Sequence, residues 1–221
     1  MESPNFLQSI VSAFQTGGTW MVPIAIALAA SISLVIERSI RLTQMNIDGA
    51  TFMHEIQKYI LANDVDGAIR ICNGATRAAL PRVLKAGLQR AGRDDTQIQN
   101  AIDAASLEVI PRLERRLSYL ALIANISTLL GLLGTINGLI RSFAATAQAD
   151  PAQRQAILSA GISEAMNATA FGLITAIFTM IMHSFLTTRA SRILEEIDEF
   201  GVKLMDLLSA RKYRHSTQKS E

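Results

Sequence analysis

Charged residues are absent from three long stretches of this chain. Residues 3–36, 117–140 and 165–188 contain no Asp, Glu, Lys or Arg. A helix needs about 20 apolar residues to cross a bilayer, so each stretch predicts a membrane-spanning helix. The first stretch is longer than one span and divides at Gly17-Gly18. Its first part predicts an amphipathic helix at the membrane surface, and its second part a span that opens with Trp20.

Between the first and second spans, apolar residues recur at helical spacing, and no strand-like alternation of useful length is present. Pro111 is expected to kink or break the last of these helices. The predicted fold class is therefore all-α, an integral membrane protein with three transmembrane helices and a helical cytoplasmic domain. The expected segments are an interfacial helix (1–18), the first span (19–36), the cytoplasmic domain (37–116), the second span (117–142), a short link (143–160), the third span (161–188) and a C-terminal helix and tail (189–221).

Composition agrees with a membrane protein and gives no sign of an enzyme. The mean hydropathy is +0.26, and the charged fraction of 18% is below the roughly 25% of soluble domains. The single cysteine, Cys72, excludes an intramolecular disulfide and a cysteine-cluster metal site. His54, His183 and His215 lie in unrelated contexts, which offer no nucleophile–base pair. We expect no catalytic site, no metal, no cofactor and no nucleic-acid partner.

Basic residues predict the orientation of the spans. Residues 37–118 hold 12 of the 21 Lys and Arg residues, and the tail from Arg189 holds seven. The positive-inside rule therefore places both segments in the cytoplasm, and the N-terminus and the link 143–160 outside. Glu37 and Arg38 are interpreted as the water-side boundary of the first span. The basic residues at the end of the tail predict contact with anionic membrane lipid.

Polar residues inside the spans form stripes. Thr128, Thr135 and Ser142 are spaced by seven and are expected to share one face. The third span carries a second stripe, made of Glu164, Thr169, Gly172, Ala176, Thr179 and His183. Unpaired polar groups are costly in hydrocarbon, so both stripes should face a bundle interior or a hydrated channel.

Three kinds of residue in these spans need an interpretation. Glu164 is either an interface carboxylate or a cation- or proton-attracting group at a channel mouth. His183 is favoured as a polar anchor at a helix end. Gly134 and Gly138 form a GxxxG pair, which lets helix backbones approach closely in lipid. Helix packing is the expected role of all four glycines in these stretches, namely Gly131, Gly134, Gly138 and Gly172.

Two sequence stretches carry a family resemblance. Residues 129–136 read LLGLLGTI, and residues 163–173 read SEAMNATAFGL. They resemble the LLGLLGTV and EAL-x-ATA-x-GL motifs of the MotA/TolQ/ExbB proton-channel family, in its three-span ExbB/TolQ branch. The order of the elements, Trp20, Glu37-Arg38 and Asp66-Gly67-Ala68 agree with this branch, so the resemblance covers nearly the whole chain.

The resemblance implies a function and partners. In the family, several copies, here expected as a pentamer, surround single transmembrane helices of a smaller ExbD/TolR-like subunit in the bacterial inner membrane. An aspartate of that subunit carries protons, and the complex drives a periplasm-spanning effector such as TonB or TolA. Carried over to this chain, the pore-lining positions are Thr135, Glu164 and Thr169. The weaker candidates for the ion pathway are Thr128, Asn137, Thr179 and His183.

Several positions depart from the family pattern. Ser127-Thr128 replaces Ala-Pro, Phe178 replaces a common proline, and His183-Ser184 replaces Tyr-Asn. The energised process could therefore be TonB-type, Tol-type or gliding-type. Two alternatives stay open, which are a sodium-driven stator subunit and a non-conducting membrane scaffold.

Overall fold

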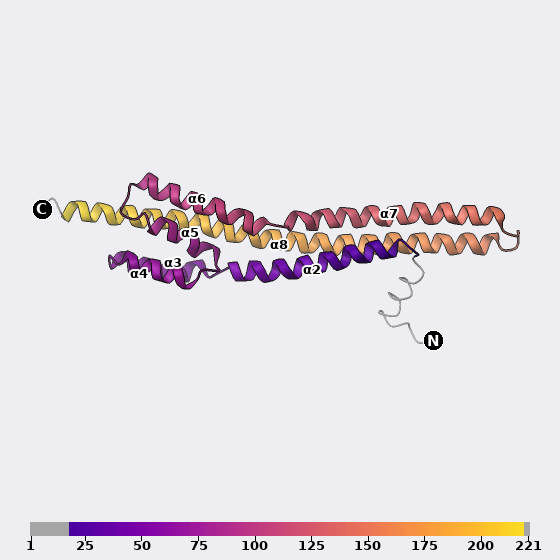
Figure 1. The fold of residues 1–221 in the computed structure, drawn as a ribbon, viewed down its shortest axis with the longest axis horizontal. Coiled ribbons are helices and arrows are strands. Elements are labelled where there is room, and N and C mark those ends of the chain that lie inside the picture. The colour runs from indigo at the N-terminus through magenta and orange to yellow at the C-terminus, as the bar shows by residue number, and fades with distance from the viewer. Residues whose placement is uncertain (1–17, 219–221) are drawn as a thin grey trace, which may run out of the picture. The chain divides into compact units, whose positions relative to one another are not determined.

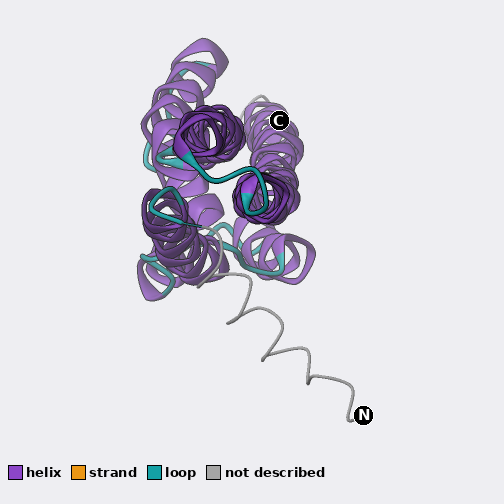
Figure 2. Cartoon of the chain, turned by 90° about the vertical axis from the view of Figure 1, so that its right-hand side faces the viewer, coloured by secondary structure: helices purple, strands orange, loops and turns teal. Residues whose placement is uncertain are grey.

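The computed structural model describes residues 18–218, with side chains up to Lys212, and every regular element in this range is a helix (Figures 1 and 2). The expected interfacial helix at 1–18 lies almost wholly outside the described residues. The helices are α2 (Met21–Met45), α3 (Gly49–Leu61), α4 (Val65–Gly74), α5 (Ala79–Leu88), α6 (Asp95–Glu114), α7 (Leu117–Gln148) and α8 (Arg154–Gln218).

Three helical segments are long and apolar enough to cross a membrane. They are Met21–Leu61, Asp95–Gln148 and Arg154–Lys212. The most apolar 18-residue window in each has a mean hydropathy of 1.8, 1.8 and 1.7, respectively. Only 28% of each window is buried within the chain, so most of this apolar surface faces outwards. The chain is a multi-pass membrane protein, and the prediction of an all-helical protein with three spans is confirmed.

The chain divides into two compact units. The first unit combines residues up to Glu37 with Arg116–Ser184, and the second combines Arg38–Arg115 with the residues from Phe185 onwards. In the first unit, α7 runs beside the first part of α8 (Figure 1), and glycines bring the two backbones together. The connection between them covers only residues 149–153, so both helices extend into the expected link of 143–160.

The second unit has a core of large aliphatic side chains. Helices α3, α5 and α6 and the later part of α8 contribute Ile56, Leu84, Leu88, Ile98 and Leu204, each at most 1% exposed. Asp48 and Asp64 cap α3 and α4 by accepting hydrogen bonds from Thr51 N and Gly67 N. Cys72 is buried here, and desolvation raises the pKa of its thiol to about 11.

The end of α6 differs from expectation. The helix continues through Pro111 to Glu114, so the proline does not break it. The carbonyl oxygens of Arg112 and Leu113 accept hydrogen bonds from the guanidinium of Arg38, the former at 3.1 Å. These carbonyls would otherwise lack helical partners, and a cation is favourable at a helix C-terminus. Arg38 is 1% exposed, so its side chain does not face water as expected, although the division between the two units falls between Glu37 and Arg38.

The chain breaks instead just before α7. Arg116 adopts a left-handed backbone with φ 66°, which interrupts the helical path between Glu114 and Leu117. Its guanidinium pairs with the carboxylate of Glu37. The helix is therefore interrupted at Arg116, which pairs with Glu37, and not at Pro111 as the sequence pattern predicted.

Candidate ion pathway

Glycines of α7 pack closely against small residues of α8. A Cβ added to Gly134 would lie 2.8 Å from Ala168 Cβ, and one added to Gly138 would lie 2.9 Å from Ala165 Cβ. A Cβ added to Gly172 would lie 2.7 Å from the Ser127 carbonyl oxygen and 2.9 Å from Gly131 Cα. The two backbones approach so closely that no larger residue fits, which is how small residues join helices in lipid.

This close approach brings two threonines of the predicted pathway to the edge of the α7–α8 interface. Thr169 Oγ1 donates a hydrogen bond across the interface to the Gly131 carbonyl oxygen at 2.9 Å. Thr135 lies one turn after Gly131 and donates to the Leu132 carbonyl oxygen at 2.7 Å. Each hydroxyl uses its proton on a backbone carbonyl and keeps lone pairs that can accept a hydrogen bond.

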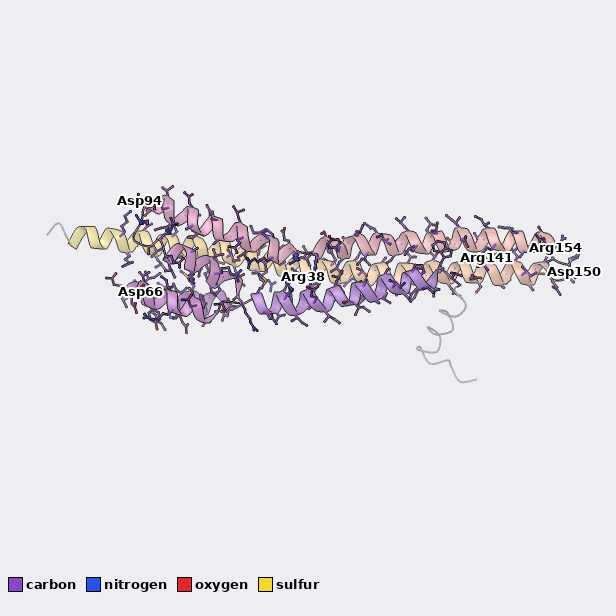
Figure 3. The ribbon with its side chains drawn as sticks, in the orientation of Figure 1. Arg38, Asp66, Asp94, Arg141, Asp150 and Arg154 are labelled. Carbon is purple, nitrogen blue, oxygen red and sulfur yellow. The ribbon has the colours of Figure 1, made fainter. Side chains whose placement is uncertain are left out.

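Glu164 lies at one end of this interface. Its carboxylate oxygen is 3.7 Å from Nη1 of Arg141, and the two side chains are 34% and 64% exposed. Gly18 has φ +71°, and a Cβ there would overlap the Glu164 carboxylate. Figure 3 shows Arg141 on α7, towards the end that leads to Asp150 and Arg154. Arg141 and Glu164 therefore lie next to the apolar stretches of α7 and α8, at the same end of the two helices.

A groove of about 780 Å³ opens beside this pair. Gly138, Ser142, Gly161, Arg141 and Glu164 are among its lining residues. A side chain on Gly161 would overlap the Ser142 hydroxyl, which donates to the Gly138 carbonyl oxygen at 2.8 Å. The small residues Gly138, Ser142 and Gly161 thus leave room for the groove, which the Glu164 carboxylate and the Arg141 guanidinium also line.

The weaker candidates do not share one environment. Thr128 is exposed, and Asn137 and His183 are half-buried. Thr179 is 0% exposed, and its hydroxyl donates to the Thr175 carbonyl oxygen at 2.8 Å, so it lies in the interior of the first unit. Ser142 is also buried, in contrast to Thr128. The residues of the second-span stripe therefore differ in exposure along α7, and their common face stays a prediction.

Comparison with known proteins identifies the family. The sequence pattern of the MotA/TolQ/ExbB proton channel family matches residues 75–199. The chain belongs to this family. The match spans α5, α6, α7 and the part of α8 that carries Glu164 and Thr169, so it includes both predicted motifs.

Relatives from several organisms support the ExbB/TolQ-like branch of the family. The putative biopolymer transport protein ExbB-like 3 of Synechocystis is 30% identical over 166 residues, which is 75% of this chain and 79% of the relative. The Tol-Pal system protein TolQ of Haemophilus influenzae is 36% identical over 104 residues, 45% of each chain. The biopolymer transport protein ExbB of Salmonella typhimurium is 38% identical over 84 residues, 33% of this chain and 34% of the relative.

Sequence reasoning missed Arg141 and Gly18 as neighbours of Glu164 in this MotA/TolQ/ExbB family member. A signal for Arg141 was present, because it is the first charge after the second charge-free stretch, and Glu164 is the last charge before the third. In an antiparallel hairpin these two positions lie at the same end. No comparable signal marks Gly18, because its contact with Glu164 depends on where α2 packs.

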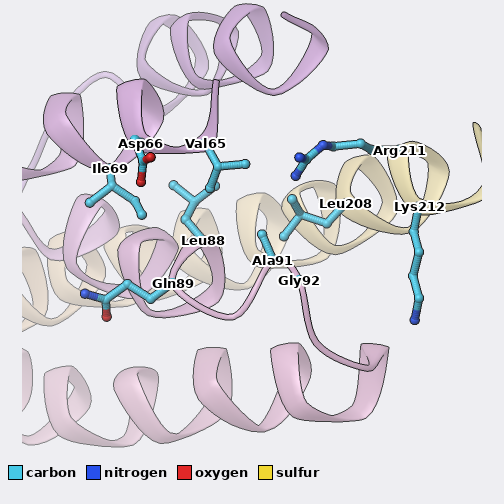
Figure 4. Close-up of a pocket in the computed structure, with 10 residues that line it drawn as sticks. All are labelled: Val65, Asp66, Ile69, Leu88, Gln89, Ala91, Gly92, Leu208, Arg211 and Lys212. Carbon is cyan, nitrogen blue, oxygen red and sulfur yellow. The ribbon is translucent and has the colours of Figure 1, made fainter. Parts of the chain in front are cut away.

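Another pocket lies in the second unit and has no evident chemistry. It has a volume of about 430 Å³ and is lined by residues that include Val65, Asp66, Leu88 and Arg211 (Figure 4). Nε of Arg211 donates to Asn63 Oδ1 at 2.7 Å, so its charge already has a polar partner. Within residues 18–212, no group of three His, Cys, Asp or Glu side chains is arranged to hold a metal ion.

Proposed function

We propose that this chain is the larger subunit of a proton-driven, energy-transducing complex of the bacterial inner membrane. Copies of the chain form a ring, a pentamer by family resemblance, around single-span helices of an ExbD/TolR-like partner. Proton flow along the interface with that partner drives work on a periplasm-spanning effector of TonB, TolA or a related type. The observation that carries this proposal is the pair of threonine hydroxyls at the α7–α8 edge.

These hydroxyls suit proton passage because their lone pairs remain available. Thr135 and Thr169 each donate to a backbone carbonyl, which leaves acceptor capacity for water, hydronium or a protonated carboxyl group. Neither threonine can carry a net proton by itself at ordinary pH. They can only accompany a proton that a titratable group delivers.

The proton carrier in the middle of the membrane comes from another chain. Residues 117–140 and 165–188 contain no Asp, Glu, Lys or Arg, Glu164 stands outside these stretches next to Arg141, and His183 stands near the opposite end of the third span. A partner aspartate in the middle of the membrane supplies the missing proton carrier. The low burial of the three spans provides apolar surface for neighbouring copies, for the partner and for lipid.

The proposed orientation follows from charge. The N-terminus and the α7–α8 connection lie in the periplasm, and residues 37–116 and the tail from 189 lie in the cytoplasm, where the basic residues concentrate. Glu164 then stands at the periplasmic end of the pathway, where protons enter under the membrane potential.

The test is proton flux in vesicles that contain this chain together with its partner subunit. Thr135→Val and Thr169→Val keep shape but remove a hydroxyl, and we expect each to lower flux about tenfold, the scale of one lost hydrogen bond. Thr146→Val is the matched control, because Thr146 has the same backbone hydrogen bond on α7, to Ser142 at 2.7 Å, outside the charge-free stretch. Full flux in the Thr135→Val/Thr169→Val double variant contradicts the proposal.

Two other functions are favoured by specific observations. The close glycine contacts of α7 and α8 also suit a non-conducting scaffold, which predicts oligomers without partner-dependent flux and tolerance of Glu164→Gln. The hydroxyl and carboxylate oxygens also suit a sodium-driven stator, because sodium accepts such ligands. Flux that follows a sodium gradient at constant pH would favour the second alternative.

A further inference from the structure

Arg141 holds the net charge beside Glu164 close to zero. The Nη1–Oε1 distance of 3.7 Å joins a permanent cation to the carboxylate at the end of the α7–α8 hairpin. Guanidinium has five donors in a planar fork, no acceptor and a positive charge. Both side chains remain partly exposed and border the 780 Å³ groove, so they face the space through which ions would approach.

We propose that Arg141 is a specificity-determining residue, which neutralises Glu164 and thereby makes the entrance of the pathway select protons against metal cations. This inference rests on the function proposed above. It assigns to Glu164 a role as a counter-charge to Arg141 instead of a proton carrier.

The selection follows from how the two kinds of ion bind. A sodium ion has to exchange hydration water for several oxygen ligands and is held by excess negative charge. A neutral Arg–Glu pair supplies no such excess, and the guanidinium repels a cation that approaches the carboxylate. A proton needs no coordination shell, because it passes between water molecules and the hydroxyl lone pairs further along the interface.

If the Arg141–Glu164 pair served only to stabilise the fold, its removal should have little effect on ion selectivity. Exposed ion pairs contribute little to stability, and the contact of 3.7 Å is too long for a strong hydrogen bond. The charge of Arg141 still acts at this distance, whether or not the pair makes direct contact. Ion selectivity is therefore the readout that separates the two roles.

The first experiment measures proton and sodium flux in vesicles that hold the complete complex, with Arg141→Gln as the variant. We expect the proton-to-sodium selectivity to fall about tenfold, because the entrance gains a net negative charge. Arg154→Gln is the matched control, because it removes an exposed arginine near the same connection, one that donates to the Ala149 carbonyl oxygen at 3.1 Å. Arg141→Lys keeps the charge and should retain most of the selectivity that Arg141→Gln loses.

The second experiment tests charge compensation. Glu164→Gln leaves Arg141 as an uncompensated cation, so proton flux should fall about tenfold. The Arg141→Gln/Glu164→Gln double variant restores neutrality and should recover most of that flux. Unchanged selectivity in Arg141→Gln, loss of selectivity in Arg141→Lys, or a double variant as defective as Glu164→Gln overturns the inference. An unchanged complex that passes no ions at all overturns the proposed function instead.

Discussion

The two units bury different kinds of side chain. In the second unit, helices meet through large aliphatic residues such as Ile56, Leu84 and Leu88. In the first unit, α7 and α8 meet through glycine and alanine, with hydroxyls at the same interface. Many large apolar residues of the first unit, such as Leu129 at 64% exposure, point outwards, while a few, such as Ile24 and Leu120, are buried.

This difference shows which force joins the helices in each unit. Removal of apolar surface from water favours a core of large side chains, as in the second unit. In lipid that gain is absent between helices, so close backbone contact and interhelical hydrogen bonds take its place. The same substitution should therefore have effects of different size in the two units, which makes the comparison testable.

The largest effect is expected from shortening a leucine in the second unit. Leu84→Ala should cost about 2–5 kcal/mol, because Leu84 is fully buried. The measurement is alkylation of Cys72, the only cysteine, whose buried thiol with a pKa of about 11 reacts mainly when the second unit opens. A loss of 2 kcal/mol raises the alkylation rate roughly 30-fold.

The matched control for this experiment is the same change in the first unit. Leu129→Ala removes an exposed apolar side chain of α7 and should leave the alkylation rate nearly unchanged. Equal rates for the two variants would show that the second unit does not depend on its aliphatic core, and the contrast between the units would fail.

A smaller effect is expected from enlarging a glycine in the first unit. Gly172→Ala would place a methyl group 2.7 Å from the Ser127 carbonyl oxygen, and the forced separation of α7 and α8 should cost about 1–3 kcal/mol. Thermal unfolding in detergent, followed by loss of helicity, measures it. Gly74→Ala is the control, because a Cβ at Gly74 has no neighbour within 4 Å. A midpoint as high for Gly172→Ala as for Gly74→Ala would contradict close packing.

Much of the fold could be predicted from the sequence because charge is expensive in a membrane. The charge-free stretches predicted the three spans, and the motifs around Thr135 and Glu164 predicted the family, which is confirmed. The extent of α8 was harder to foresee. Its continuation from the third span towards Gln218 has no proline to stop it, so the polar and apolar parts form one helix.

The remaining features depend on tertiary partners that a local pattern does not contain. Arg38 follows an apolar run and resembles a solvent-facing end, yet the carbonyl groups of a helix more than 70 residues away surround its guanidinium. The proposed role of Arg141 likewise depends on its distance to Glu164. The different exposure of Thr128 and Ser142 also depends on which side chains pack at each level of α7, and the seven-residue spacing does not contain that information.

The smallest effect on stability is expected from removing the charge of Glu196, which lies on the part of α8 that belongs to the second unit. Burial, and then the nearby Asp48 and Glu199, raise the pKa of Glu196 above 4.5, while Arg192 lowers it. A raised pKa in the folded state means that stability is highest below the unfolded-state pKa and declines as pH rises through the folded-state pKa. Glu196→Gln should therefore unfold at the same temperature as the unchanged chain below about pH 4.5, and at a slightly higher temperature near pH 7.

The gain near pH 7 should stay below roughly 0.5 kcal/mol, because Glu196 lies near the surface. Glu195→Gln is the matched control, because it removes the same charge from the exposed neighbouring position of α8. Thermal unfolding of both variants between pH 4 and 8 separates the effect of burial from that of net charge. A Glu196→Gln variant less stable at pH 7 than the unchanged chain would mean that the carboxylate has a stabilising partner, and that the polar rim of the second unit contributes to stability beyond its aliphatic core.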